Sequence, residues 1–256
     1  MDLGLKGKKA LVTGATRGIG RAIAETFADE GADIAICARH QEQVNETVEA
    51  LKHKGVQVIG GTVDVADGPA LKAWIADVGQ ALGGIDMLVS NPSAFARQNT
   101  DQDWESSFQI DLMGAVRSVE AAKPFLERAA QDSGDAAIVI IASAFAAEVH
   151  MAPPYGALKS ALIHFVKGIA RQEASKRIRV NAVSPGTVYF KGGIWNSIEE
   201  HMPARFEEFM KRNPTGRMAT PQEIANAVVF LASPASSFTT GINMLVDGAY
   251  TVRVNF

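Results

Sequence analysis

Three side chains in one stretch of the sequence, Ser143, Tyr155 and Lys159, are of the types that move a proton to or from an oxygen atom. Tyr155 and Lys159 are four residues apart in a segment with a helical pattern, so both project from one face of the predicted helix. A phenol titrates near ~10, and a neighbouring ammonium lowers its pKa toward the range in which acid–base catalysis is efficient. The pair is therefore a candidate proton donor and acceptor, although the spacing alone is also common on solvated helix faces.

Ser143 ends a run of Ile and Val that begins at Ile138 and is typical of a buried parallel strand. A hydroxyl at the carboxyl end of such a strand lies at the edge where open α/β sheets bind ligands, and it can donate a hydrogen bond to a carbonyl oxygen. A serine alone is more typical of a helix cap or a turn. The nearby Tyr155 and Lys159 favour the chemical role.

Length and composition predict one large α/β domain over residues 1–256. No linker divides the chain, and a net charge of -3 without long like-charge runs argues against nucleic acid or an anionic membrane as a partner. The amino terminus has no apolar core of signal-peptide length and no apolar run is long enough to span a bilayer, so we expect a cytoplasmic protein. The scattered histidines and the single Cys37 give no metal-site spacing, and no metal is predicted.

A glycine-rich turn, Thr13 to Gly20, follows a short strand and precedes a helix and a second strand. This βαβ unit predicts a three-layer, doubly wound parallel sheet of the Rossmann type. Glycines let the backbone approach a phosphate, whose charge the N–H groups and dipole of the helix N-terminus stabilise. The pattern favours a dinucleotide site over a purely structural turn. The candidate binding residues of the turn are Gly14, Thr16, Arg17, Gly18, Ile19 and Gly20.

Further candidate residues for binding the dinucleotide stand at the ends of the next three strands. Arg39 follows the second strand with no carboxylate beside it; with Arg17 it favours the 2′-phosphate of NADP(H) over NAD(H), unless Arg39 only begins a solvated helix. Asp64 and Val65 follow the third strand, where Asp64 accepts a hydrogen bond from an adenine amino group or is a turn residue. Asn91 ends the fourth strand and is expected to face the cofactor crevice.

These motifs, together with NAVSPG at Asn181 and the segments that begin at Pro214 and Gly241, resemble the short-chain dehydrogenase/reductase family over essentially the whole chain. The similarity is to the single-domain branch that includes 3-oxoacyl-carrier-protein reductases. It implies that Tyr155 exchanges a proton with the substrate oxygen, and that Lys159 lowers the pKa of Tyr155 and holds the nicotinamide ribose. It implies that Ser143 polarises the carbonyl group.

The same resemblance assigns further residues and an assembly. Pro185, Gly186 and Val188 are implied to line the nicotinamide, which carries the hydride. The amphipathic helix from Pro221 to Ala232 and the final strand pair across two-fold axes in relatives, so a homo-oligomer, either a tetramer or a dimer, is expected.

The chain departs from the family pattern at three places. Asp111, which with Gly114 interrupts a long helical stretch, stands where the family usually has an Asn that holds a proton-relaying water. An ionised carboxylate accepts hydrogen bonds but cannot donate them, and its charge alters nearby pKa values, so Asp111 is a candidate catalytic residue with a changed task. The loop Ser90-Asn91-Pro92-Ser93 replaces the usual Asn-Asn-Ala-Gly. The stretch between Ser143 and Tyr155 is about one residue shorter than expected.

The least family-like segment, residues 187–213, is rich in apolar side chains and has a candidate hinge at Gly192-Gly193. We interpret it as an inserted lid that closes over the substrate, or alternatively as a surface that packs on the body or on another subunit. Its cations form no cluster suited to an acyl-carrier protein, so a small apolar ketone, aldehyde or alcohol is expected. The predicted function is NADP-dependent interconversion of such a carbonyl compound and its alcohol. The alternatives are a 3-oxoacyl thioester reductase and a non-catalytic, dinucleotide-sensing binding protein.

Overall fold

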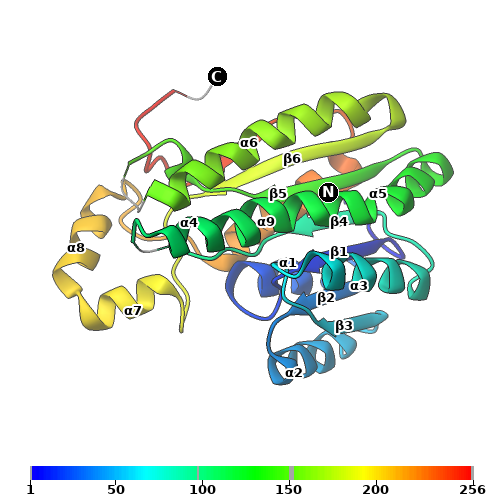
Figure 1. Ribbon diagram of the computed structural model, residues 1–256, viewed down its shortest axis with the longest axis horizontal. Helices are drawn as coiled ribbons and strands as arrows, with labels where there is room; N and C mark the ends of the chain where they lie inside the picture. Colours follow the sequence, from blue (N-terminus) through cyan, green and yellow to red (C-terminus); the bar gives the residue numbers. More distant parts are fainter. Residues whose placement is uncertain (1, 97, 150–152, 255–256) are drawn as a thin grey trace.

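Parallel strands pair in the order β3-β2-β1-β4-β5-β6-β7 and form one sheet in the computed structural model, which describes residues 2–96, 98–149 and 153–254 (Figure 1). The strands are β1 Lys9–Thr13, β2 Asp33–Ala38, β3 Val58–Thr62, β4 Met87–Ser90, β5 Ala136–Ile141, β6 Ile178–Pro185 and β7 Asn243–Val246. Every residue of the central strands β4, β5 and β6 is buried, whereas the edge strands β3 and β7 are only partly covered. A strand covered on both faces requires the near-continuous apolar runs that the sequence shows.

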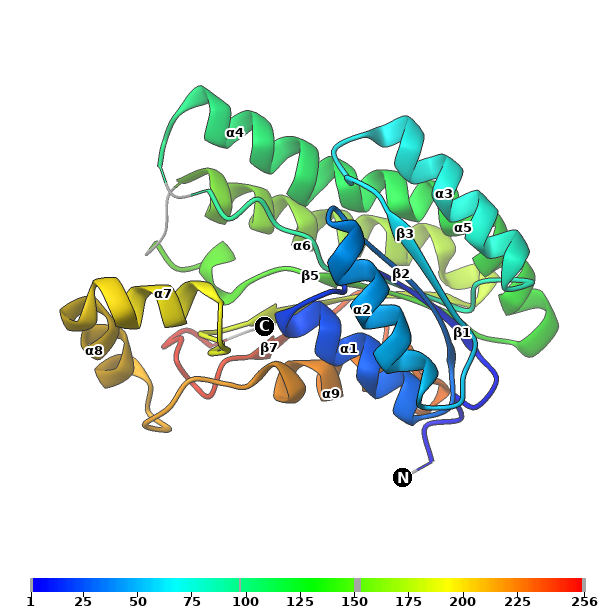
Figure 2. The same cartoon turned by 90° about the horizontal axis from the view of Figure 1, so that it is seen from below.

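Helices cover both faces of the sheet, which gives the expected three layers. Figure 2 shows α1, α2 and α9 on one side of the strands and α3, α4, α5 and α6 on the other. Alternate residues of one strand enter different layers: Val12 packs with α1 and α9, and its neighbour Leu11 packs with α3 and α5. The helices are α1 Gly18–Asp29, α2 Gln41–Lys52, α3 Gly68–Ala81, α4 Asp101–Ser107, α5 Gly114–Ser133, α6 Pro153–Glu173, α7 Ile194–His201, α8 Pro203–Arg212 and α9 Pro221–Ala232.

Short helical turns complete the chain and carry part of the site. A π-helical turn, η1 (Phe108–Met113), joins α4 to α5 at the position where the sequence predicted an interruption by Asp111 and Gly114. The wider π turn is frequently found at functional sites because it displaces a side chain from the regular helical position. The 3₁₀ turns are η2 Ala144–Ala146, η3 Ala174–Lys176 and η4 Pro234–Ser236.

The strand order changes direction between β1 and β4, and open α/β sheets bind their ligands at such a switch point, outside the carboxyl ends of the strands. The strands end level with one another there, because Thr13 is paired with Cys37 on one side and with Ser90 on the other. The turns that follow β1, β4, β5 and β6 therefore meet at one edge. Thr16, Arg17, Asn91 and Ser143, which the sequence analysis selected, are in these turns.

The segment 187–213 extends beyond this edge as the helices α7 and α8 (Figures 1 and 2). Gly192, before α7, has the positive φ of +77° that suits a glycine. The apolar side chains of the segment 187–213 pack with the body of the domain in an aromatic cluster. Within it, Trp195 contacts Phe209 with ring centroids 4.7 Å apart. The buried members of this cluster are Phe145, Tyr155, Trp195, Ile198, Phe209, Met218 and Tyr250.

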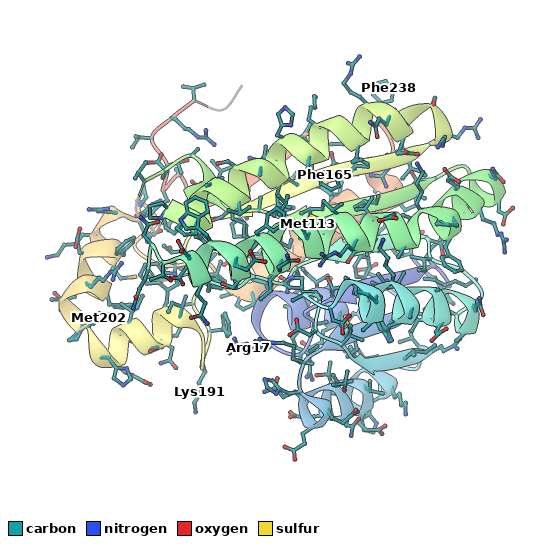
Figure 3. The ribbon with its side chains drawn as sticks, in the orientation of Figure 1. Arg17, Met113, Phe165, Lys191, Met202 and Phe238 are labelled. Carbon is teal, nitrogen blue, oxygen red and sulfur yellow. The ribbon has the colours of Figure 1, made fainter. Side chains whose placement is uncertain are left out.

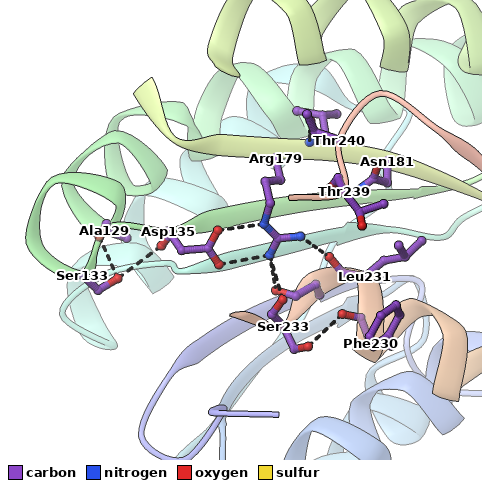
Figure 4. A network of polar contacts seen from close by, with 12 residues as sticks. Ala129, Ser133, Asp135, Arg179, Asn181, Phe230, Leu231, Ser233, Thr239 and Thr240 are labelled. Atoms are coloured by element: carbon purple, nitrogen blue, oxygen red, sulfur yellow. Dashed lines mark hydrogen bonds and ion pairs between the residues drawn. The ribbon is translucent and has the colours of Figure 1, made fainter. Parts of the chain in front are cut away.

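A buried arginine, Arg179 in β6, ties the sheet to the end of α9 (Figure 4). Its Nε donates to Asp135 Oδ1 at 2.7 Å and its Nη2 to Asp135 Oδ2 at 3.0 Å. The same guanidinium donates to the carbonyl oxygens of Leu231, Ala232 and Ser233. A planar fork of donors suits this combination of one carboxylate and several carbonyl groups, and lysine has no equivalent geometry.

We expect Arg179→Met to lower the free energy of unfolding by about 3 kcal/mol, because a carboxylate and three carbonyl oxygens lose their donor. Urea denaturation measures the loss, and Arg128→Met on the exposed face of α5 is the matched control, expected to change it by under about 0.5 kcal/mol. Equal stability of the two variants would contradict this account of the network.

Candidate active site at the carboxyl edge of the sheet

Ser143, Tyr155 and Lys159 lie together and are all buried. Ser143 follows β5 and begins η2, where its Oγ accepts a hydrogen bond from Phe145 N at 3.2 Å. Tyr155 is in the first turn of α6 and shares a hydrogen bond with Ser143. Lys159 is one turn further along α6, and its Nζ lies 5.9 Å from the centre of the Tyr155 ring. Two hydroxyl groups and one ammonium group therefore converge at the edge of the sheet.

The pKa of Tyr155 is raised above its ordinary value. Burial is the largest cause; the Lys159 ammonium and the hydrogen bond with Ser143 lower the pKa, and the charge of Asp111 raises it again. The lysine acts in the direction that the sequence analysis expected, but the expected net lowering is wrong because desolvation outweighs it. At neutral pH the phenol therefore keeps its proton.

Asp111 and Lys159 form a buried ion pair, with Asp111 Oδ1 3.1 Å from Lys159 Nζ and exposed fractions of 3% and 1%. Lys159 Nζ also donates to the carbonyl oxygen of Ile141 at 3.0 Å. The second carboxylate oxygen, Asp111 Oδ2, accepts a hydrogen bond from Ala94 N at 3.0 Å. Asp111 Oδ2 thus accepts a hydrogen bond, whereas the buried Oδ1 has the ion pair with Lys159 and accepts no hydrogen bond from the described residues.

Sequence analysis missed Phe95, which lies in the β4 loop (residues 91–96) that follows β4. Its ring stacks on the ring of Tyr155, with centroids 5.3 Å apart and an angle of 25° between the planes, and the residue is 43% exposed. Phe95 has a φ of +51°, a left-handed conformation that is strained for a bulky residue. The only signal in the sequence is an aromatic residue shortly after a strand end in a predicted crevice.

The glycine-rich turn forms a close-fitting bend between β1 and α1. Gly14 and Gly18 have φ values of +67° and +54°, and a Cβ at Gly20 would overlap the carbonyl oxygen of Gly14. Asn91 Nδ2 donates to Gly14 O at 2.8 Å and so joins the β4 loop to this turn. The first N–H groups of α1, from Gly18 onward, have no partner within the helix and are available to an anion. The turn therefore fits a phosphate group.

The other predicted residues of the turn surround this bend. Thr16 Oγ1 donates to Gln43 Oε1 of α2 at 3.2 Å, and Ile19 packs partly buried in the first turn of α1. Arg17 is exposed at the N-terminus of α1 (Figure 3). The ring of Phe190 occupies the space in which a Cβ at Gly18 would lie. The loop after β6 therefore reaches the glycine turn.

The remaining predicted cofactor residues lie at the same edge. Arg39 is exposed directly after β2, and Asp64 is exposed after β3, where its Oδ1 accepts from Ala66 N at 3.0 Å as a turn residue does. Val65 is buried against Gly114. Pro185 ends β6, Gly186 N donates to Val246 O, and Val188 forms a parallel bridge with Ala219. Residues 150–152, within the stretch described as short, lie outside the described residues.

A family model described as Enoyl-(Acyl carrier protein) reductase matches residues 14–251. The chain belongs to the short-chain dehydrogenase/reductase family. The similarity to isoepoxydon dehydrogenase patN of Penicillium expansum is 38% identity over 261 residues, covering 100% of this chain and 99% of the relative. The similarity to 3-oxoacyl-[acyl-carrier-protein] reductase FabG of Staphylococcus aureus is 34% identity over 248 residues, covering 94% of this chain and 97% of the relative.

The fold of this short-chain dehydrogenase/reductase is that of solved members of the family. L-sorbose reductase of Gluconobacter frateurii, solved with NADPH and L-sorbose, superposes with a TM-score of 0.91 at 32% identity and covers 99% of this chain and 100% of its own. These relatives are dehydrogenases and reductases, and the chain is an oxidoreductase of their family.

In the part of the chain that the structure describes, no group of three or more His, Cys, Asp or Glu side chains is arranged so that it could hold a metal ion. In the same residues, no helix is both long enough and apolar enough to span a bilayer.

We expect Gly20→Ala to weaken NADPH and NADH binding at least about tenfold, because the added methyl group must displace the Gly14 backbone on which the phosphate site is built. Fluorescence titration measures the affinity. Gly168→Ala on α6, where a Cβ meets open space, is the control and should bind as the wild type does. Thermal denaturation establishes that both variants are folded; unchanged affinity in folded Gly20→Ala would show that the bend does not form the nucleotide site.

Proposed function

We propose that this protein transfers a hydride between NADP(H) and a small apolar carbonyl compound or alcohol, with Tyr155 as the acid and base. The observation that carries the proposal is the buried Tyr155 hydroxyl, hydrogen-bonded with Ser143 and next to Lys159, at the edge where the glycine turn also lies. A proton donor, a second hydroxyl and a phosphate-binding turn at one crevice are the parts that a carbonyl reduction needs.

The bound nicotinamide supplies the hydride in reduction and accepts it in oxidation. In reduction, Ser143 donates a hydrogen bond to the carbonyl oxygen and stabilises the charge that develops there. Tyr155 gives its proton to this oxygen, and Lys159 stabilises the tyrosinate that remains. In oxidation the tyrosinate accepts the proton of the alcohol. The raised pKa of Tyr155 keeps the proton available for donation at neutral pH.

The nucleotide would be held by the residues around the glycine turn. Gly14, Gly18 and Gly20 shape the phosphate site, Asn91 fixes the turn, and Asp64 with Val65 stands where the adenine is expected. Pro185, Gly186 and Val188, at the end of β6, are proposed to line the nicotinamide.

The preference for NADP(H) is supported by the two exposed cations Arg17 and Arg39 and by the absence of a carboxylate at the end of β2. Solved structures of related chains hold NADPH in some cases and NADH in others. The charge at the end of β2 is therefore the argument on which this preference rests.

A small apolar substrate is favoured over an acyl-carrier protein by the composition of the α7–α8 segment. Arg212 pairs with Glu208 at 2.6 Å and, like Arg205, lies over the ring of Phe209. The two arginines of α8 therefore lie over an aromatic ring, which leaves Lys211 as the remaining cation of the helix. Reduction of a 3-oxoacyl thioester is the second candidate function, because a 3-oxoacyl-[acyl-carrier-protein] reductase is 34% identical to this chain.

The wider setting of the enzyme is proposed from the sequence and the family. We infer a homo-oligomer, a tetramer or a dimer formed through α9 and β7, and a cytoplasmic location. The segment 187–213 is proposed to act as a lid over the substrate, with its hinge at Gly192-Gly193.

We expect Tyr155→Phe to reduce turnover by a factor on the order of 10³ while nucleotide affinity stays within about twofold, because only the transferable proton is lost. Consumption of NADPH with a panel of ketones, aldehydes and 3-oxoacyl thioesters measures the rate, and fluorescence titration measures affinity. Turnover equal to that of the wild type would rule out Tyr155 as the proton donor.

Arg39→Ala should raise the Kd for NADPH about tenfold and leave the Kd for NADH within about twofold, because only NADPH carries the 2′-phosphate. The neighbouring exposed residue gives the control: His40→Ala should change neither Kd. Equal weakening of both nucleotides by Arg39→Ala would contradict the proposed phosphate contact.

A further inference from the structure

The environment of Asp111 favours a carboxylate over an amide. Oδ1 faces the Lys159 ammonium at 3.1 Å, and Oδ2 faces the N–H of Ala94 at 3.0 Å. Each of these neighbours is a donor, and an ionised carboxylate accepts on both oxygens. An asparagine has one acceptor oxygen and one donor NH2 group. In either orientation its NH2 group would face a donor, either the ammonium or the Ala94 N–H.

The hydrogen bond from Ala94 fixes the β4 loop close to Tyr155. The loop is joined to the glycine turn at Asn91 and to the π turn at Ala94, and Phe95 N donates to Ser93 Oγ at 3.2 Å. These bonds flank the positive φ of Phe95 and offset its strain. Because the backbone is held in this conformation, the Phe95 ring lies against the ring of Tyr155.

The position of Phe95 gives it access to both the reacting group and the solvent. One face of its ring covers Tyr155, yet the residue is 43% exposed. A molecule that approaches the Tyr155 hydroxyl past this ring meets a flat aromatic surface. Flat unsaturated groups stack on such a surface more favourably than flexible alkyl chains of similar size.

We propose that Phe95 determines substrate specificity in favour of carbonyl compounds with a flat unsaturated ring, and that the Asp111 carboxylate is the positioning residue that sets Phe95 on Tyr155. This inference rests on the proposed carbonyl reduction. Asp111 acts through Ala94 on the loop and through Lys159 on the proton donor, so one residue links the substrate surface to the acid–base pair.

The first test measures the loop directly and does not depend on turnover. Hydrogen exchange of the backbone amides in residues 91–96, followed by mass spectrometry, should be at least about tenfold faster in Asp111→Asn than in the wild type. The one acceptor oxygen of the asparagine is drawn to the Lys159 ammonium, so the Ala94 N–H loses its acceptor. Exchange in the strands β4 and β5 is the internal control and should stay unchanged. Unchanged exchange in the loop would overturn the positioning role of Asp111.

The second test compares acetophenone with octan-2-one, which have the same number of carbon atoms and differ in flatness. Phe95→Ala should lower the ratio of the two kcat/KM values, acetophenone over octan-2-one, about tenfold, and Phe95→Tyr should preserve the ratio. The matched control is Phe238→Ala, which removes a fully exposed ring. Phe238 lies at the opposite end of the molecule from Met202, the residue that precedes α8 (Figure 3). An unchanged ratio in Phe95→Ala would overturn the specificity role.

A double-mutant cycle then shows whether Asp111 acts through Phe95. Asp111→Asn should lower the same ratio in the wild-type background and have no further effect on it in the Phe95→Ala background. Equal effects in both backgrounds would show that Asp111 acts on the substrate by another route and would overturn the proposed link. If the wild type reduces neither these ketones nor the wider panel, the proposed function fails, and with it the specificity role. The exchange result then still decides the positioning of the loop.

Discussion

The buried ion pair between Lys159 and Asp111 is the interaction on which the arrangement of this site depends. Two charges removed from water are costly unless other hydrogen bonds complete their surroundings. Here Lys159 also donates a hydrogen bond to the carbonyl oxygen of Ile141, and Asp111 Oδ2 accepts one from the N–H of Ala94. The pair therefore fixes the end of β5, the β4 loop, the π turn and α6 relative to one another. Removing either partner would leave the other charge buried and unpaired.

The topology of the sheet determines which segments this ion pair can join. Parallel strands end at one edge, and the strand order reverses there between β1 and β4, which is where open α/β sheets bind ligands. The turn after β1 offers backbone N–H groups, whereas the turns after β4 and β5 bring Phe95 and Ser143 beside Tyr155. The π turn contributes the buried Asp111 carboxylate.

The elements and the candidate site were predictable from local patterns, but the balance of forces within the site was not. Apolar runs and turn residues predicted the strands and the helix Pro221–Ala232, and the i, i+4 spacing placed Tyr155 and Lys159 on one face. The sequence also predicted an interruption at Asp111. The net pKa shift of Tyr155 depends on how much water the folded chain excludes, and the position of Phe95 depends on a backbone φ that only the contacts of its loop stabilise. Neither quantity is expressed in residue types or spacings.

Burial controls the proton of Tyr155 even though the Lys159 ammonium is close to it. The ammonium lowers the pKa of the phenol, the Asp111 carboxylate opposes this to a smaller extent, and desolvation of the phenol is the largest effect of all. The pKa of Tyr155 therefore rises. A tyrosine that holds its proton is ready to donate it, while oxidation of an alcohol first requires the proton to leave. In the proposed reaction, the burial of Tyr155 thus keeps the phenol in the protonated form that reduction of a carbonyl compound uses at neutral pH.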